Sequence, residues 1–262
     1  MCGIVGYIGH REAFPIIIKG LQRLEYRGYD SAGVALLTGQ LNVYKKQGKV
    51  SDLLAFSEGK DTTSNIGIGH TRWATHGVPN DINAHPHTSK SKSIALIHNG
   101  IIENYDVIKE ELTKRGYFFK SETDTEVLAH LIEEVQRQEG VSLFEAVRLS
   151  LAEVIGAYAI AVIEESNPNE IIVAKKGSPL VIGLGENEFF LASDASPIIE
   201  YTKNVVYLED GEIARLKIGE EMELKTIENI IKTPYIQELE MNLEAIEKGG
   251  YEHFMLKEIF EQ

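Results

Sequence analysis

The sequence predicts a layered α/β or α+β domain whose sheets are largely antiparallel. Helical and strand-like segments alternate irregularly along the 262 residues, and the strand-like segments come in adjacent pairs. Short polar turns join the two members of each pair. Antiparallel strands can be joined in this way, whereas parallel strands need a long crossover. A doubly wound nucleotide-binding sheet is therefore not expected.

Length and composition are those of a globular protein with one large domain or two small ones. Hydrophobic residues make up 43% and charged residues 25% of the chain, and no apolar run approaches the roughly 18 residues of a membrane helix. The start lacks the basic and apolar regions of a signal peptide. A formal net charge of −14 argues against nucleic acid and anionic membranes as partners. The single cysteine excludes an internal disulfide and agrees with a cytoplasmic location.

The N-terminal part predicts a buried strand, a helix and a hairpin. Residues 4–8 form an apolar run, with glycines where another backbone can approach. Residues 12–24 predict an amphipathic helix with Pro15 in its first turn, where the missing N–H does no harm. The following predicted elements are a polar loop over 26–33, hairpin strands over 34–37 and 41–44, a short helix over 51–57 and a loop over 61–65.

Strands and polar loops alternate in the middle of the chain. A buried strand over 66–70 runs into a polar segment over 71–77, and a long loop over 78–92 precedes a strand over 93–98. That strand is expected to stop at Asn99 and Gly100, because this pair tolerates the positive φ of turns. Taken alone, the pair favours a plain hairpin turn.

Three helices and three strand pairs are predicted next. Asn104 caps a helix that ends at Gly116, a second helix opens within 121–126 and ends at Gly140, and a third covers 143–154. The strand pairs are 157–163 with 171–174, 180–184 with 189–192, and 205–208 with 213–216. From about residue 235 the chain is acidic, amphipathic and helix-prone, which is typical of a junction to a further domain.

The strongest candidate for chemistry is Cys2. Removal of Met1 would make it the N-terminal residue, with a free α-amine beside its thiol. That amine has an ordinary pKa of about 7.7 to 8.0, so it can take the thiol proton and later return one to a leaving group. One residue would then supply both nucleophile and base. The alternative is a small buried residue that opens a core strand.

Six segments in order resemble the motifs of class II glutamine amidotransferases. They are 1–6 (MCGIVG), 24–33 (LEYRGYDSAG), 70–77 (HTRWATHG), 83–87 (NAHPH), 98–104 (HNGIIEN) and 121–126 (SETDTE). Together they resemble the glutaminase part of the glucosamine-6-phosphate synthase family, and 251–262 (YEHFMLKEIFEQ) resembles its junction with the isomerase domain. The resemblance extends over essentially the whole chain.

The resemblance implies an N-terminal-nucleophile hydrolase fold, a four-layer αββα arrangement with two mainly antiparallel sheets between helical layers. It implies a glutaminase domain over 1–240 and a helical junction over 241–262 that leads to an absent sugar-phosphate isomerase domain. The implied reaction is hydrolysis of L-glutamine to glutamate and ammonia through a Cys2 γ-glutamyl thioester. In the full-length enzyme, implied to be a homodimer, the ammonia would serve the conversion of fructose 6-phosphate to glucosamine 6-phosphate.

The resemblance also assigns roles to single residues. The side-chain amide of Asn99 and the backbone N–H of Gly100 would stabilise the tetrahedral oxyanion. Arg72 would bind the α-carboxylate of glutamine, and Asp124 its α-ammonium group. The remaining assignments are Thr75, His76 and Gly77 as pocket lining, Trp73 as an aromatic gate on the ammonia path, and Arg27 and Gly28 as the loop beside Cys2.

Several alternatives stay open at this point. Without the motifs, Arg72 would be a surface or ion-pair residue, Asp124 a helix N-cap and Trp73 a packing residue. The whole chain could instead belong to another class II amidotransferase, such as one that feeds phosphoribosyl pyrophosphate, or be a silent regulatory module. No cofactor or metal is expected, because the spacing of the histidines fits no standard zinc pattern. The segment 85–87 is expected to belong to a loop that closes over glutamine; the histidines considered are His70, His76, His85, His87 and His98.

Overall fold

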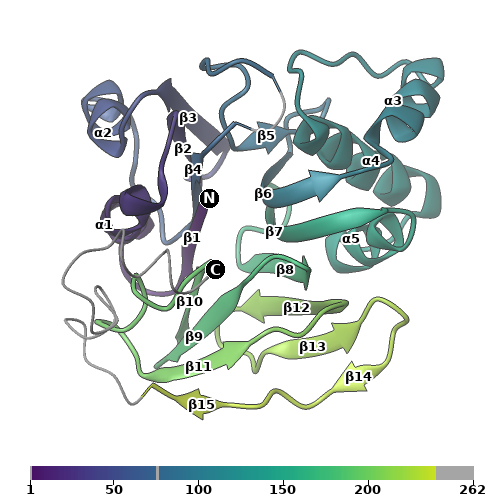
Figure 1. Ribbon diagram of the computed structural model, residues 1–262. Coiled ribbons are helices and arrows are strands. Elements are labelled where there is room, and N and C mark those ends of the chain that lie inside the picture. The colour runs from purple at the N-terminus through teal and green to yellow at the C-terminus, as the bar shows by residue number, and fades with distance from the viewer. Residues whose placement is uncertain (1, 75–76, 240–262) are drawn as a thin grey trace.

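The structure is a computed structural model that describes residues 2–74 and 77–239. Within these ranges the chain forms two sheets, and every strand pairing in them is antiparallel (Figure 1). The predicted α+β class with mainly antiparallel sheets is confirmed. The predicted junction over 241–262 lies outside the described residues.

In the described residues, the first sheet has eight strands in the order β15-β11-β9-β10-β1-β4-β2-β3. They are β1 Gly3–Ile8, β2 Ser31–Leu37, β3 Leu41–Gln47, β4 Ile66–Arg72, β9 Val181–Gly185, β10 Glu188–Ala192, β11 Asn204–Tyr207 and β15 Gln237–Glu238. The first strand of the chain, β1, lies inside this sheet between β10 and β4. Strand β1 is thus anchored by pairing on both of its edges, and Cys2 directly precedes it.

Over the same ranges, the second sheet has seven strands in the order β14-β13-β12-β8-β7-β6-β5. They are β5 His87–Thr88, β6 Ile94–Ile102, β7 Gly156–Glu164, β8 Glu170–Lys176, β12 Glu212–Lys217, β13 Glu223–Thr226 and β14 Ile231–Lys232. The helices are α1 Ala13–Leu24, the short 3₁₀ helix Glu25–Arg27, α2 Val50–Ser57, α3 Tyr105–Lys114, α4 Asp124–Glu139 and α5 Leu143–Ala152.

Three apolar clusters hold the sheets and helices together as layers. One cluster lies between the two sheets and joins residues such as Ile68 of β4 to Ile97 of β6. A second packs α1 and α2 on the outer face of the first sheet, and a third packs α4 and α5 on the outer face of the second. This is the expected helix–sheet–sheet–helix order (Figure 1). Because both faces of each sheet are covered, the inner strands are buried on both sides.

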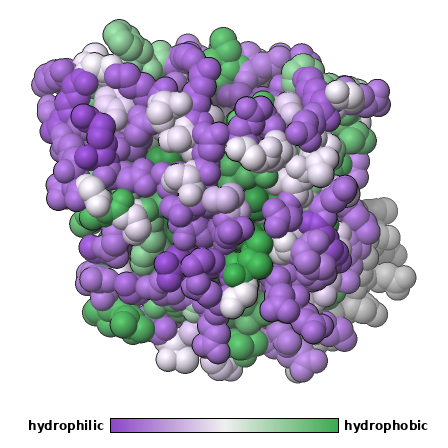
Figure 2. Space-filling view, turned by 180° about the vertical axis from the view of Figure 1, so that it is seen from behind, coloured by the Kyte–Doolittle hydropathy of each residue, from purple (hydrophilic) through white to green (hydrophobic). Residues whose placement is uncertain are grey.

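The surface opposite to that of Figure 1 is mostly hydrophilic, with a narrow apolar band near its middle (Figure 2). No helix in the described part of the chain is long and apolar enough to cross a membrane.

Most predicted elements are present, and local signals explain their ends. Helix α4 begins where the Thr123 hydroxyl accepts a hydrogen bond from the N–H of Glu126, and it ends at Gly140 with φ of +62°. Asp124 is thus the first helical residue and not the N-cap. Asn104 precedes α3 as predicted, but its side chain bonds the O of Glu153 and the N of Ile155 and caps nothing.

The predicted turn at Asn99 and Gly100 is wrong. Strand β6 continues through both residues to Ile102, and Gly100 lies opposite Tyr158 of β7. A Cβ atom at position 100 would lie 2.1 Å from the carbonyl oxygen of Ala157, and φ there is +130°. Glycine is required here because a neighbouring strand approaches closely. Glycine is also common in turns, so its presence in the sequence does not show which of the two reasons applies.

Other predicted boundaries also differ from the structure. The pairing of 205–208 with 213–216 is wrong, because β11 pairs with β9 in the first sheet and β12 pairs with β8 in the second. The turn between them carries the chain from one sheet to the other. Strand β2 takes the last three residues of the loop predicted over 26–33, and β15 lies within the segment predicted as helix-prone.

Candidate active site

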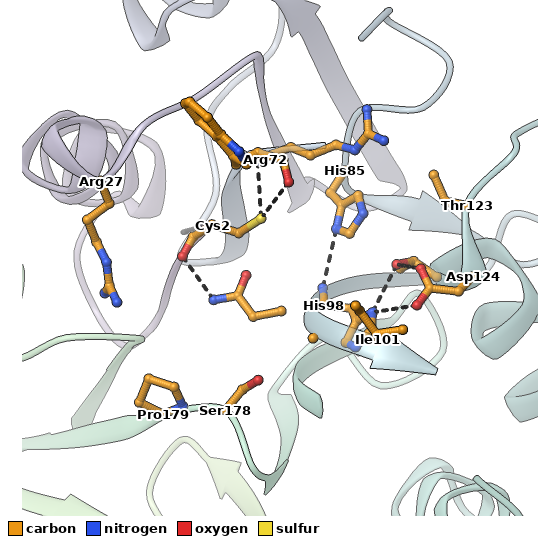
Figure 3. A pocket seen from close by; sticks show the side chains of 14 residues that line it. Cys2, Arg27, Arg72, His85, His98, Ile101, Thr123, Asp124, Ser178 and Pro179 are labelled. Atoms are coloured by element: carbon orange, nitrogen blue, oxygen red, sulfur yellow. Dashed lines mark hydrogen bonds and ion pairs between the residues drawn. The ribbon is translucent and has the colours of Figure 1, made fainter. Parts of the chain in front are cut away.

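A pocket of about 400 Å³ opens where the N-terminal end of β1 faces β6 of the other sheet. Seven residues that the sequence singled out line it: Cys2, Arg27, Arg72, Trp73, Asn99, Gly100 and Asp124. Seven more also line it, of which only His85 lies in a segment expected to contact glutamine: His85, His98, Ile101, Thr123, Thr125, Ser178 and Pro179. Cys2 lies on one side of the pocket and Asp124 on the other (Figure 3).

The thiol of Cys2 is held by the backbone of a residue 71 positions away in the sequence. Its Sγ accepts a hydrogen bond from the Trp73 N–H at 3.1 Å and lies 3.4 Å from the Trp73 carbonyl oxygen, to which it can donate. Burial raises the pKa of the Cys2 thiol, and the Trp73 N–H opposes this shift. A thiol with a raised pKa is protonated near neutral pH, so it needs a base before it can act as a nucleophile.

The side chain of Asn99 links the two sheets. Its Nδ2 donates to the main-chain oxygen of Cys2 at 3.2 Å, and its Oδ1 lies 2.8 Å from Nε2 of His70. Gly100 follows in the same strand and also lines the pocket. The side-chain NH₂ of Asn99 has two hydrogens, so one remains for a ligand in the pocket.

Arg72 is buried at the end of β4, where Asp30 and Gly77 contact its guanidinium. Its Nη1 lies 3.7 Å from Oδ1 of Asp30, and its Nη2 donates to the carbonyl oxygen of Gly77 at 3.2 Å. Asp30 also accepts hydrogen bonds from the Ser31 hydroxyl and the Ala74 N–H. Arg72 therefore forms an ion pair, as the alternative interpretation predicted, and it also lines the pocket.

Asp124 is buried at the start of α4 and anchored to β6. The Ile102 N–H donates to its Oδ2 at 2.9 Å, and the ring of His98 lies 3.9 Å from the same oxygen. The N-terminal end of a helix favours negative charge. The pocket therefore contains one buried cationic and one buried anionic side chain, Arg72 and Asp124, as a zwitterionic ligand requires.

Of the remaining predicted residues that the structure describes, Trp73 and Arg27 line the pocket. The Trp73 side chain is 54% exposed and packs on Gly28, where a Cβ atom would lie 2.4 Å from the indole ring. The positive φ of Gly28, +93°, also favours glycine. Gly77 contributes through its carbonyl oxygen to Arg72 and is not among the lining residues. Thr75 and His76 lie outside the described residues.

Four of the histidines form a buried group at the pocket wall, and two of them, His85 and His98, line the pocket. His70 stacks on His85 with ring centroids 4.2 Å apart, and His87 lies edge-on to His85 at 4.9 Å. Burial lowers the pKa of His70 to about 3 and holds the pKa of His85 and His87 well below their usual range. His98 contacts Thr125 at 3.1 Å. The described residues contain no group of three or more His, Cys, Asp or Glu side chains that could hold a metal ion.

The segment 85–87 was predicted to belong to a loop that closes over glutamine. His85 and His87 are both buried, and His85 lines the pocket, so its contact with glutamine stays a prediction. His98 and Thr125 lie inside two of the quoted motifs, but nothing in the sequence assigned either residue a role in the site. Their place in the wall depends on β6 meeting the start of α4.

Comparisons with known proteins agree with this site. A family model described as "Glutamine amidotransferase domain" matches residues 56–242. The chain is 62% identical over its whole length to the glutamine–fructose-6-phosphate aminotransferase (isomerizing) of Bacteroides thetaiotaomicron and 51% identical to that of Pyrococcus horikoshii. It spans 43% and 44% of these relatives, so less than half of each.

Solved structures show the same fold. The glutamine phosphoribosylpyrophosphate amidotransferase of B. subtilis matches with a TM-score of 0.73 and 32% identity, over 86% of this chain and 49% of the other. A structure described as the allosteric regulatory enzyme of purine biosynthesis matches with a TM-score of 0.75 and 33% identity, over 87% and 50%. The expected N-terminal-nucleophile hydrolase fold is confirmed. With its two-sheet fold, its cysteine-containing pocket and a family match over more than two thirds of its length, this chain belongs to the glutamine amidotransferase family.

Proposed function

We propose that this chain hydrolyses the side-chain amide of L-glutamine to glutamate and ammonia, with Cys2 as the nucleophile. The observation that carries the proposal is the placement of three groups around one pocket: the Cys2 thiol, the Arg72 guanidinium and the Asp124 carboxylate. Glutamine has an electrophilic amide at one end and a carboxylate and an ammonium group at the other. Arg72 binds the carboxylate, Asp124 binds the ammonium group, and the amide then lies against the thiol.

The first half of the reaction forms a thioester. After removal of Met1, the free α-amine of Cys2 takes the thiol proton, and the sulfur attacks the amide carbon. The oxyanion that forms is stabilised by Nδ2 of Asn99 and the N–H of Gly100. The protonated amine returns its proton to the leaving nitrogen, so that ammonia departs and the γ-glutamyl thioester remains.

The second half consumes one water. The α-amine removes a proton from the water, which attacks the thioester carbon through a second oxyanion at the same donors. Collapse of this intermediate breaks the C–S bond, and the sulfur leaves with the proton as the free thiol of Cys2. The products are glutamate and a regenerated enzyme.

The other predicted residues act around this chemistry. We place Thr75, His76 and Gly77 beside the bound glutamine, and Trp73 on the path by which ammonia leaves. Arg27 and Gly28 hold the segment beside Cys2, where Gly28 gives the indole of Trp73 its packing surface. No cofactor takes part, because the thiol, the α-amine and the attacking water supply every proton and electron pair that the reaction needs.

In a longer polypeptide, the ammonia would convert fructose 6-phosphate to glucosamine 6-phosphate on an isomerase domain, which a helical junction over 241–262 joins to the glutaminase domain over 1–240. Support comes from the 62% identity to a glutamine–fructose-6-phosphate aminotransferase, against 32% to a phosphoribosylpyrophosphate amidotransferase. We further propose that the longer polypeptide is a homodimer located in the cytoplasm. Neither nucleic acid nor a membrane is a partner in it.

Intact mass and glutamate release, measured on the same sample, test the proposal. Loss of the mass of Met1 together with glutamate release is the expected result, and Cys2→Ala is expected to abolish release while the thermal melting curve stays that of a folded protein. Full activity with Met1 still attached would show that the α-amine of Cys2 is not the base. Unchanged turnover in Cys2→Ala would rule out the thiol as the nucleophile.

A further inference from the structure

The amide of Asn99 has a definite orientation in the structure. Its Nδ2 lies 3.2 Å from the main-chain oxygen of Cys2. A carbonyl oxygen can only accept hydrogen bonds, so the amide group that faces it must be the NH₂. The opposite orientation would bring two acceptor oxygens into contact. The Oδ1 atom therefore points the other way, toward Nε2 of His70 at 2.8 Å.

The orientation of Asn99 in turn determines which nitrogen of His70 carries a proton. Oδ1 is an acceptor, so Nε2 must carry the hydrogen and donate it. Burial lowers the pKa of His70 to about 3, so the ring is neutral and has a single proton to place. The His70 ring is fully buried in β4 and stacked on His85 with centroids 4.2 Å apart, so it cannot turn away without disturbing the packing.

Orientation matters because the two ends of an amide have opposite polarity. With NH₂ toward the pocket, Asn99 offers a donor to the oxyanion; turned by 180° about its last bond, it would offer an acceptor and repel the same charge. We propose that His70 is a positioning residue, whose Nε2–H holds the oxygen of Asn99 and so keeps the NH₂ group directed at the reacting carbonyl. This inference rests on the proposed oxyanion role of Asn99.

Two substitutions, His70→Gln and His70→Asn, distinguish a positioning role of His70 from a role in packing alone, because both introduce a neutral amide. In His70→Gln the amide nitrogen takes the place of Nε2 and can still donate to Asn99, whereas in His70→Asn the shorter amide reaches only the place of Nδ1. His70→Asn is expected to lower kcat about 10- to 100-fold, part of the loss known for an oxyanion donor, with an unchanged KM for glutamine. His70→Gln is expected to keep most of the activity. A His70→Asn variant with the original kcat overturns the inference, as does an equal loss in both variants.

The Asn99→Ala background provides a second readout. If His70 acts through Asn99, His70→Asn costs nothing further in kcat once Asn99 is gone. A further loss of similar size would indicate a general structural role. His130→Asn is the matched control, because it removes another buried imidazole, in α4 beside Tyr117 and Phe119, and should leave kcat unchanged. Activity retained in Asn99→Ala itself would contradict the proposed oxyanion role, whereas activity lost there but kept in His70→Asn contradicts only the positioning role.

A measurement on the unsubstituted chain does not depend on how the variants fold. Nitrogen-15 NMR of the histidine rings distinguishes the two neutral tautomers, and the assigned His70 signal is expected to show the proton on Nε2 from pH 6 to 8. A proton on Nδ1 would mean that His70 accepts from Asn99, which overturns the inference directly.

Discussion

The guanidinium of Arg72 lies 3.7 Å from the carboxylate of Asp30, at the end of β4 and beside the pocket. Asp30 does not line the pocket, but it holds the cation proposed to bind the α-carboxylate of glutamine. Asp30→Asn removes the charge and keeps the acceptor for the Ala74 N–H. We expect KM for glutamine to rise about ten-fold, which corresponds to about 1.4 kcal/mol, with a smaller change in kcat. A selective fall in kcat in steady-state kinetics would contradict this role.

Asp124 combines two functions that different substitutions can separate. Its carboxylate accepts the Ile102 N–H at 2.9 Å and faces the pocket. Asp124→Asn keeps an acceptor but loses the charge, so it should mainly raise KM for glutamine. Asp124→Ala should raise KM and also lower the free energy of unfolding by about 1–3 kcal/mol, because a buried N–H loses its partner. Equal stability of the two variants in urea titrations would show that the hydrogen bond is not needed.

Gly100→Ala should destabilise the protein strongly. The added Cβ would lie 2.1 Å from the Ala157 carbonyl oxygen, on a backbone with φ of +130°. Gly116→Ala is the matched control, because φ there is +84° but nothing lies within 4 Å of the new atom. We expect a loss of about 1–2 kcal/mol for the control, from backbone strain alone, and a clearly larger loss at position 100. Similar melting temperatures for both variants would contradict the close approach of β7.

The buried histidines should make stability depend on pH. The folded-state pKa of His87 lies well below its usual value because the ring is buried, whereas in the unfolded chain it is about 6.5. Below pH 6.5 the unfolded state thus binds a proton that the folded state does not, and stability falls as the pH falls. His87→Gln should reduce this slope by up to about 1.4 kcal/mol per pH unit. His10→Gln, at an exposed histidine, is the control in urea titrations from pH 7.5 to 5; an unchanged slope in His87→Gln would contradict the assignment.

Local features of the sequence predicted the helices and most hairpins well. The cap at Thr123, the left-handed Gly140 and the hairpin between β2 and β3 depend on residues within a few positions of each other. The same reasoning failed at Asn99 and Gly100, where a turn pair lies inside a continuous strand. A positive φ is common to turns and to close strand contacts, so the residue types alone cannot tell the two apart.

By itself, the sequence determined the fold class, the family motifs and the candidate nucleophile, because these are properties of residue order and of short-range chemistry. Only the tertiary structure decided which side chains meet. Cys2 and Asn99 are 97 residues apart, and they touch because β1 and β6 lie in sheets that pack face to face. The same packing brought His70 to Asn99 and sent β11 and β12 to different sheets. Contacts between distant segments depend on how the whole core packs, and no local pattern encodes that arrangement.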